Sequence, residues 1–399
     1  MGAWKTAVFP FCRFRIPPLQ AAKQVSKARI YAIDMLIPMF RLFPLLFFVL
    51  CLFGISSAYA TPDESKFVVL AYSSMADDDA RSILKKHFSY LKQGDESTKL
   101  YSLEKALASV ITVQRPVMPV SVVVTVEDTS LSFLSEIIPF IKKEKIPVTF
   151  IVTPSRIDRL PDSERSETWR LLKSISNDPA VNFAITSYDY VTLPALPEAE
   201  IKRQIASARA RFHEMMGFNA AYFTYPYGAY TANLQSLVKQ QGFVAAFGMQ
   251  GGAVSALSNT YALPRFPITD GYDDINRLQT IIETLPFPAT DIQPDTSYLT
   301  TNPPVIGFSV PNAWMKKMQN LKCYGQEMGE LTMTPLGQGR IEIRFSDAFE
   351  NERTRINCTW PEVDAEKTTR WRWLGFLFVK NDAAPAASSE TTGQPALLP

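Results

Sequence analysis

A valine-rich run from Val120 to Val126 ends directly on two adjacent carboxylates, Glu127 and Asp128. An apolar, β-branched run of this length predicts a buried strand. In barrels built of alternating strands and helices, the residues that carry chemistry lie at the carboxyl ends of the strands. The sequence therefore places its first candidate site at the Glu127–Asp128 pair.

The stretch from residue 66 to residue 285 alternates between strand-like and helix-like segments. Such alternation is typical of a mostly parallel sheet covered by helices, so we predict an α/β domain over these residues, either open or closed into a barrel. We expect strands at 67–72, 120–126, 147–152, 181–185, 221–225 and 244–247, and helices at 77–91, 131–143, 198–216 and 232–241.

The pattern changes after residue 285. Residues 286–304 are rich in Pro, Thr and Asp and predict a linker, whereas residues 305–380 contain strand-like segments without helices. These segments, at 305–310, 321–324, 340–345, 353–359 and 370–379, predict a small all-β sandwich. The low-complexity residues 381–399 predict a disordered tail.

Residues 1–60 have the pattern of an export leader. An apolar run from Leu45 to Ile55 follows Arg41 and precedes Ala58-Tyr59-Ala60, an arrangement that predicts a signal peptide cleaved after Ala60. The run is too short to span a bilayer comfortably, although an uncleaved membrane anchor is the alternative. Met35 or Met39 are plausible true starts. We therefore expect an exported protein, located in the periplasm or the cell envelope.

The net charge of the whole chain is positive, whereas that of the part after the leader is negative. The whole sequence has 41 basic and 39 acidic residues, but residues 1–60 hold seven of the basic ones and one acid, which leaves 34 basic and 38 acidic residues. No basic stripe remains, so we expect no nucleic-acid partner. The two cysteines outside the leader, Cys323 and Cys358, predict one disulfide in an exported protein, with two buried thiols as the alternative.

Several motifs occur in an order and spacing that resemble one family. They are Thr125–Asp128 (TVED), Phe223–Tyr230 (FTYPYGAY), Gly242–Gly252 (GFVAAFGMQGG), Leu263–Ile268 (LPRFPI), Arg355–Trp360 (RINCTW) and Arg370–Trp373 (RWRW). Together they resemble the polysaccharide deacetylase (NodB-homology, carbohydrate esterase family 4) family over about residues 66–380. The similarity is strongest to the exported branch that resembles poly-β-1,6-N-acetylglucosamine deacetylases. It implies a deformed parallel (β/α) barrel followed by a small all-β sandwich.

The resemblance also implies a reaction, the removal of acetyl groups from N-acetylglucosamine. In the family, one Asp and two His hold zinc or another divalent metal, which polarises the carbonyl and activates water. A further carboxylate serves as the base, and an Arg orients a carboxylate at the site. By position, Asp128 matches the metal ligand, Glu127 the base and Arg265 the orienting residue, while Thr186 and Tyr190 stand where the two His belong.

This substitution makes a zinc site unfavourable, because hydroxyl and phenol groups are poor ligands for zinc. The chain has two histidines, and we expect His87 to face the core from helix 77–91 and His213 to lie on a helix outside the barrel. Asp189 is a further carboxylate near the same edge that could replace a lost ligand. The residues therefore predict a degenerate metal site with no cofactor.

Purely structural roles could also explain the presence of the candidate site residues. Glu127 and Asp128 could cap the next helix, accept hydrogen bonds from sugar hydroxyls, or act as a catalytic pair. The segment Tyr225-Pro226-Tyr227-Gly228 could form only a turn, or its two tyrosines could be exposed and stack on sugar rings. Arg265 could pair with any neighbouring acid. Trp371 and Trp373 share one face of a strand and favour core packing over glycan stacking.

Three functions remain open from the sequence. The first is a degenerate member of the deacetylase family that binds an amino-sugar polysaccharide at Tyr190 and residues 225–228 without cleaving it. The second is an active polysaccharide N-deacetylase with unusual ligands. The third is an envelope scaffold protein that keeps only the folded shell. Contact with a membrane is expected only through an uncleaved leader.

Overall fold

The structure is a computed structural model that describes residues 66–73, 75, 77–93, 98–111, 120–268, 274–363 and 367–381. The expected leader at 1–60 and nearly all of the expected tail at 381–399 lie outside these residues. None of the described helices combines the length and the apolar character needed to cross a membrane.

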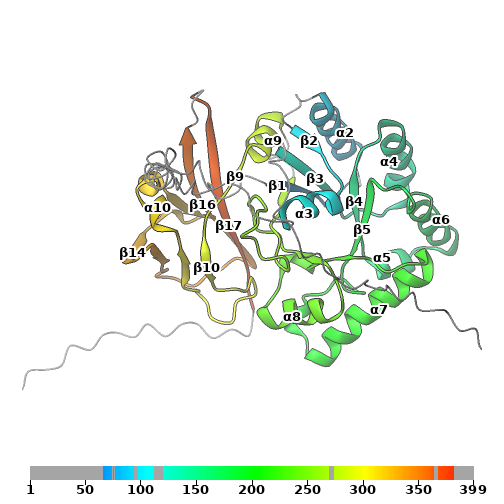
Figure 1. Cartoon of the computed structure of the whole chain (residues 1–399). Helices are drawn as coiled ribbons and strands as arrows, with labels where there is room; N and C mark the ends of the chain where they lie inside the picture. The colour runs from blue at the N-terminus through cyan, green and yellow to red at the C-terminus, as the bar shows by residue number, and fades with distance from the viewer. Residues whose placement is uncertain are drawn as a thin grey trace, which may run out of the picture. The chain divides into compact units, whose positions relative to one another are not determined.

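A curved sheet of parallel strands forms the N-terminal domain (Figure 1). Neighbouring strands follow the order β7-β6-β5-β4-β3-β1-β8, and β2 pairs with the start of β3. Their bounds are β1 Phe67–Tyr72, β2 Thr98–Leu100, β3 Val120–Val126, β4 Val148–Val152, β5 Val181–Ile185, β6 Tyr222–Thr224, β7 Ala245–Phe247 and β8 Phe266–Ile268.

The gap between the two edge strands is closed by the segment that precedes β8. Leu263 forms a parallel bridge with Phe247, its N–H donates to the Ala246 carbonyl, and it accepts from the Gly248 N–H. A connection this short replaces a full strand, so the barrel is deformed. The predicted fold class is confirmed.

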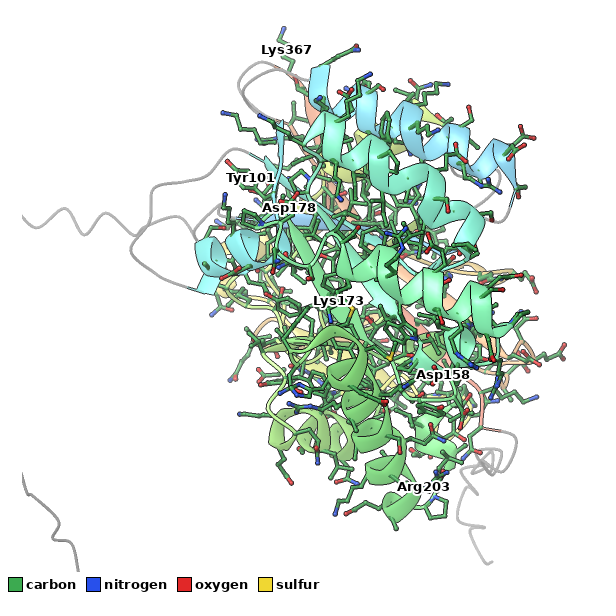
Figure 2. All side chains as sticks on the ribbon, turned by 90° about the vertical axis from the view of Figure 1, so that its right-hand side faces the viewer. Tyr101, Asp158, Lys173, Asp178, Arg203 and Lys367 are labelled. Carbon is green, nitrogen blue, oxygen red and sulfur yellow. A yellow bond between two sulfur atoms is a disulfide. The ribbon has the colours of Figure 1, made fainter. Side chains whose placement is uncertain are left out.

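Helices lie around the outside of the sheet, where α2, α4, α6 and α7 can be followed in Figure 1. The four expected helices are confirmed within about two residues at each end. On α7, Arg203 points away from the barrel and pairs with Glu200 (Figure 2). The bounds are α2 Asp78–Gln93, α3 Leu103–Ile111, α4 Leu131–Glu144, α5 Pro154–Asp158, α6 Asp162–Lys173, α7 Glu198–Met216, α8 Ala232–Gln240 and α9 Ile275–Ile282, with 3-10 turns η1 Leu193–Ala195 and η2 Pro226–Gly228.

Side chains on the two faces of the strands belong to two separate hydrophobic clusters. Val122, Val124 and Phe150 face the helices, whereas Val123 and Ile151 belong to the cluster inside the barrel. Because side chains alternate with a period of two, the same inward face continues through Glu127, Thr153, Thr186 and Thr224 at the carboxyl ends of the strands. The barrel mouth is therefore lined with polar side chains above an apolar interior.

The C-terminal region is a sandwich of an antiparallel sheet, ordered β10-β11-β15-β14, and a second sheet, ordered β13-β12-β16-β17-β9, in which only β9 runs parallel to its neighbour. Phe308 and Ile343 of one sheet and Ile356 and Trp360 of the other meet in a common core. The bounds are β9 Leu285–Pro286, β10 Thr290–Gln293, β11 Ile306–Ser309, β12 Lys322–Gly325, β13 Gly329–Leu331, β14 Met333–Gly337, β15 Arg340–Ile343, β16 Arg353–Val363 and β17 Thr369–Val379.

Two features differ from the expectation for this region. Residues 286–304, expected to be a linker, contribute the end of β9 and all of β10, which pair with β17 and β11. The expected absence of helices is wrong, because α10 (Asn312–Met315) and the 3-10 turn η3 (Lys317–Asn320) follow β11. Short elements of this kind depend on distant partners, which local composition does not reveal.

The predicted disulfide is present. Cys323 and Cys358 are bonded across the paired strands β12 and β16, where they stand directly opposite each other, and both are fully buried. The bond joins two strands of one sheet inside the sandwich core.

Candidate functional site

Glu127 lies at the centre of the barrel mouth and is only 6% exposed. It follows β3, where its backbone N–H donates to the Tyr72 carbonyl at 2.9 Å. One carboxylate oxygen accepts from the Arg265 guanidinium at 2.7 Å, and the other accepts from the Tyr190 hydroxyl at 3.1 Å. Three residues that the sequence marked separately are thus joined in one buried cluster.

Arg265 is fully buried and reaches the mouth from the segment that closes the barrel. Its Nε donates to the Gly248 carbonyl at 2.9 Å, and its guanidinium lies 5.7 Å from the Phe247 ring centroid. Its Nη2 has no hydrogen-bond partner among the described residues. The expected pairing with a carboxylate is found, and Glu127 is that carboxylate.

Asp128 is engaged by backbone amides. One oxygen accepts from the Met75 N–H at 2.9 Å, and the other accepts from the Ser130 N–H at 2.7 Å. Ser130 is the residue before the first turn of α4, and an aspartate that binds the amide two residues onward stabilises such a turn. Asp128 thus binds the amide of the residue before α4 and stabilises the turn from strand to helix, without binding an amide of the first helical turn.

The two residues at the expected histidine places do not offer metal ligands. Thr186 is fully buried, and its hydroxyl bonds to the Thr153 hydroxyl and donates to the Ser187 carbonyl, both at 2.9 Å. Burial, followed by the negative charge of Glu127, raises the pKa of Tyr190 to about 12, so its phenol is neutral at pH 7. Zinc favours imidazole, thiolate or carboxylate, so these residues do not fit a zinc centre.

Other candidates do not supply the missing ligands. Asp189 is paired with Arg159 at 2.8 Å and accepts from the Gln204 side chain at 2.9 Å. Within the residues that the structure describes, no group of three or more His, Cys, Asp or Glu side chains is placed to hold a metal ion.

The two histidines lie where the sequence indicated. His213 is exposed in the last turn of α7. His87 is fully buried on α2, and its Nδ1 lies 2.8 Å from the Tyr72 hydroxyl. This Tyr72–His87 bond was not expected from the sequence, because the two residues belong to different elements.

The turn after β6 corrects part of the expected sugar-binding set. Tyr225 is fully buried, with its hydroxyl donating to the Tyr261 carbonyl at 3.0 Å, so the expectation that it is exposed is wrong. It continues the alternation of Phe223 and therefore faces the helices. Pro226 and Gly228 are buried as well, and only Tyr227, at 39% exposed, reaches solvent.

Gly228 explains the shape of this turn. Its φ of +75° favours glycine, and a Cβ at this position would lie 2.8 Å from Leu377 of β17 and from Met249. The turn therefore packs closely against the C-terminal sandwich and holds Tyr227 at the mouth.

We call Tyr190, Tyr227, Arg156 and Arg353 the tyrosine rim. The two tyrosine rings meet edge to face with centroids 5.0 Å apart. The Arg156 guanidinium lies 4.1 Å from the Tyr190 ring centroid, and that of Arg353 lies 5.9 Å from the Tyr227 centroid. The sequence gave a weak signal for Arg156, which follows the end of β4, and none for Arg353, which comes from the sandwich.

The tryptophans of β17 separate into two environments. Trp373 packs edge to face on Phe266 of the barrel, with ring centroids 5.3 Å apart. Its Nε1 donates to the Asn357 side chain at 2.9 Å. This contact agrees with the predicted core packing for Trp373. Trp371 is 38% exposed.

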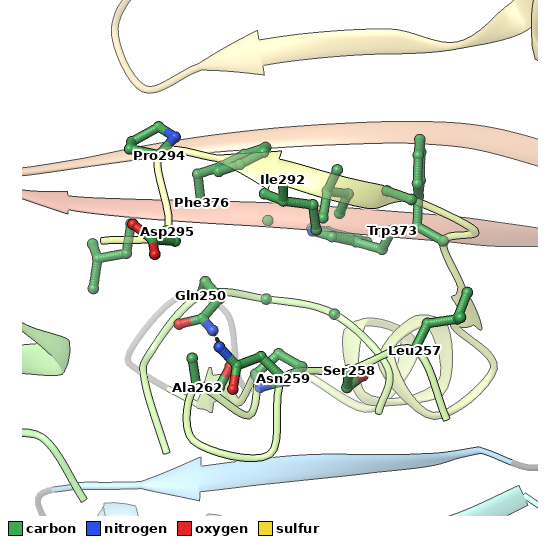
Figure 3. Close-up of a pocket in the computed structure, with 18 of the residues that line it drawn as sticks. Gln250, Leu257, Ser258, Asn259, Ala262, Ile292, Pro294, Asp295, Trp373 and Phe376 are labelled. Carbon is green, nitrogen blue, oxygen red and sulfur yellow. Dashed lines mark hydrogen bonds between the residues drawn. The ribbon is translucent and has the colours of Figure 1, made fainter. Parts of the chain in front are cut away.

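A cavity of about 380 Å³ lies between the barrel segment 250–262 and strand β17 (Figure 3). Gln250, Asn259, Trp373 and Phe376 are among the residues that line it. Glu127, Arg265 and the tyrosine rim do not contribute to its lining, so it is separate from the barrel mouth.

Comparisons with known proteins found similarity to one family model and to several solved structures. Residues 114–246 match the family model described as polysaccharide deacetylase. The structure of IcaB from Ammonifex degensii aligns at 21% identity with a TM-score of 0.46, covering 54% of this chain and 97% of its own. The Streptococcus pyogenes deacetylase PplD aligns at 16% identity with a TM-score of 0.47, covering 54% and 98%.

The BpsB deacetylase domain from Bordetella bronchiseptica aligns at 16% identity with a TM-score of 0.43, covering 52% of this chain and 97% of its own. No curated protein matches this chain significantly. The family match includes β3 through most of β7 and therefore contains Glu127, Asp128, Thr186, Tyr190 and Tyr227. Residues 114–246 are thus similar to the polysaccharide deacetylase family.

Proposed function

We propose that the barrel mouth binds an N-acetylglucosamine-type polysaccharide without metal-dependent removal of its acetyl groups. The observation that carries this proposal is the state of the three residues that the resemblance places at the metal positions of the family. Asp128 is bonded to two backbone amides, Thr186 to Thr153 and the Ser187 carbonyl, and the Tyr190 hydroxyl to Glu127. Asp128 is the one carboxylate among these three groups, and a threonine hydroxyl and a neutral phenol are poor ligands for zinc.

Glu127 is also poorly placed to act as a base. Both of its oxygens accept hydrogen bonds, and its charge is balanced by the buried Arg265. A general base must reach the proton that it removes and be free to accept it. The mouth does present two aromatic side chains, because Tyr190 and Tyr227 pack together above the Glu127–Arg265 pair. Aromatic side chains beside a few fixed polar groups are typical of ligand sites.

Acetate release from N-acetylglucosamine oligomers tests the absence of turnover. We expect none from the purified protein with added Zn²⁺, with added Co²⁺ or with EDTA. Release that EDTA abolishes would instead establish an active deacetylase with ligands outside those discussed. Binding is measured on the same sample by titrating its intrinsic fluorescence with the oligomers. We expect Tyr227→Ala to weaken binding by roughly two- to tenfold, since one stacking partner is lost.

Tyr324→Ala provides the matched control. Tyr324 is 45% exposed, close to the exposure of Tyr227, but it belongs to β12 in the sandwich. Its replacement is expected to leave oligomer binding unchanged. Equal weakening by both variants would argue against a site at the mouth, and a folded protein that binds no oligomer would favour the scaffold function.

The proposal includes export, for which the apolar run from Leu45 to Ile55 and the cysteine pair are the support. We expect the protein to be recovered from the periplasm with Thr61 as its first residue. Intact mass measured on the periplasmic fraction checks this. A cytoplasmic protein that retains residues 1–60 would contradict it.

A further inference from the structure

The tyrosine rim carries two guanidinium groups, and neither forms an ion pair in the part of the chain that the structure describes. They belong to Arg156 and Arg353, which are both exposed. Arg355, two residues along β16, lies on the same face of that strand, and its Nη1 donates to the Met249 carbonyl at 3.3 Å. Burial and the nearby charge of Arg353 lower the pKa of Arg355.

Three acids near the mouth are already engaged. Glu127 is paired with Arg265, Asp128 is bonded to two backbone amides, and Asp189 is paired with Arg159. Glu350 and Glu352 precede Arg353 in the chain but form no ion pair with it in the described structure. The rim therefore presents an excess of guanidinium groups beside two aromatic rings.

One of these guanidinium groups comes from the sandwich. Arg353 begins β16, whereas Tyr227 belongs to the turn after β6. The close packing of Gly228 on Leu377 and the bond from Arg355 to Met249 join the two regions at this point. The sandwich thus completes one side of the mouth and adds a charge that the barrel lacks.

A second, independent feature is a buried hydrogen-bond donor. Nη2 of the fully buried Arg265 has no partner among the described residues, although the same guanidinium binds Glu127 and Gly248. Buried donors without a partner are costly, and each one calls for an explanation such as a bound water, an ion or a functional role. Nη2 of Arg265 therefore provides, below the rim, one more donor for an acceptor oxygen.

We infer that the mouth recognises an acidic glycan, in which sugar rings lie on Tyr190 and Tyr227 while a carboxylate or phosphate group binds Arg156 and Arg353. The inference rests on the proposed function and specifies its ligand. A planar guanidinium matches both kinds of anion, with two parallel hydrogen bonds. The same charges repel a polymer of free amino sugars, so the N-acetylated acidic polymer is favoured over the deacetylated one.

The test compares three hexasaccharides by fluorescence or calorimetric titration. They are alternating N-acetylglucosamine and glucuronate (hyaluronan), uniform N-acetylglucosamine, and uniform glucosamine. We expect the affinity to fall in that order, with about tenfold between the first two at low salt, and this preference to shrink as added salt screens exposed charges. Competition by N-acetylglucosamine 6-phosphate, against N-acetylglucosamine itself, shows whether phosphate serves as well as carboxylate.

Variants locate the preference. Arg156→Gln and Arg353→Gln are each expected to reduce the ratio of acidic to uncharged hexasaccharide affinity by about three- to fivefold. Arg203→Gln makes the same change of charge on the outer face of α7, and it is expected to leave both affinities unchanged. Thermal unfolding of each variant confirms that it is folded.

The outcomes are distinguishable. If the uncharged hexasaccharide binds as tightly as hyaluronan, or if both rim variants keep the full preference, the acidic-glycan inference is wrong while the proposed function stands. If no hexasaccharide binds to the folded protein, the inference and the proposed function fail together.

Discussion

Replacing Arg265 with methionine is expected to lower the free energy of unfolding by about 3–5 kcal/mol. The substitution leaves the carboxylate of Glu127, which is 6% exposed, without its cation. The Tyr190 hydroxyl would remain as a partner, but a single neutral donor does not compensate a buried charge. The loss appears as a lower urea midpoint in equilibrium unfolding followed by fluorescence.

Two comparisons isolate the ion pair from simple loss of packing. The double variant Glu127→Gln with Arg265→Met removes both charges and is expected to be more stable than Arg265→Met alone. Arg159→Met breaks the pair with Asp189, in which Arg159 is 69% exposed, and should cost less than about 1 kcal/mol. A cost below about 1 kcal/mol for Arg265→Met would contradict a large stabilising contribution from this buried pair.

Removing the disulfide is the second large effect that we expect. Replacing both Cys323 and Cys358 with alanine opens a loop of 35 residues, which in the chain-entropy model lowers the free energy of unfolding by about 3–4 kcal/mol. Both sulfurs lie in the buried core of the sandwich, so the variant also loses apolar contacts there. Urea unfolding of the oxidised protein, the reduced protein and the double variant measures the two contributions separately.

The double variant also serves as the control for reduction. A reducing agent should shift the midpoint of the unmodified protein toward that of the variant and leave the variant itself unchanged. A midpoint insensitive to reduction in the unmodified protein, together with two reactive thiols, would mean that the cysteines are not bonded in solution.

Much of the fold could be predicted because the barrel strands are locally encoded. The strands β1, β3, β4 and β5 are so rich in apolar residues that their own composition predicts their burial. The short or highly charged helices α5 and α6 were not anticipated, since they have little apolar periodicity to distinguish them from loops. Strand β10 was also missed, because its pairing with the distant β11 decides its conformation.

The site was predicted in part for the same reason. Glu127, Arg265 and Tyr190 could each be picked out by motif, and the structure joins them although Arg265 lies 138 residues and Tyr190 lies 63 residues from Glu127 in sequence. Tyr225 was misjudged because its motif suggested a turn at the surface, while the alternation of β6 continues one residue further and turns its ring inward.

The sequence by itself determined which chemical groups are available. It has two histidines, His87 and His213, and the motif resemblance predicts Thr186 and Tyr190 at the positions of the metal-binding imidazoles. These facts follow from residue identity and local pattern, and no folding can supply a side chain that the chain lacks. The order of strands and helices was determined in the same way, by apolar periodicity along the chain.

Only the tertiary structure decided what those groups do. It bonds Asp128 to the amides of Met75 and Ser130, and it brings Arg353 of the sandwich over Tyr227 of the barrel. Contacts between distant residues depend on strand register, barrel closure and the packing of one domain on another. Local sequence patterns do not encode these, which is why the charged tyrosine rim became visible only in the folded protein.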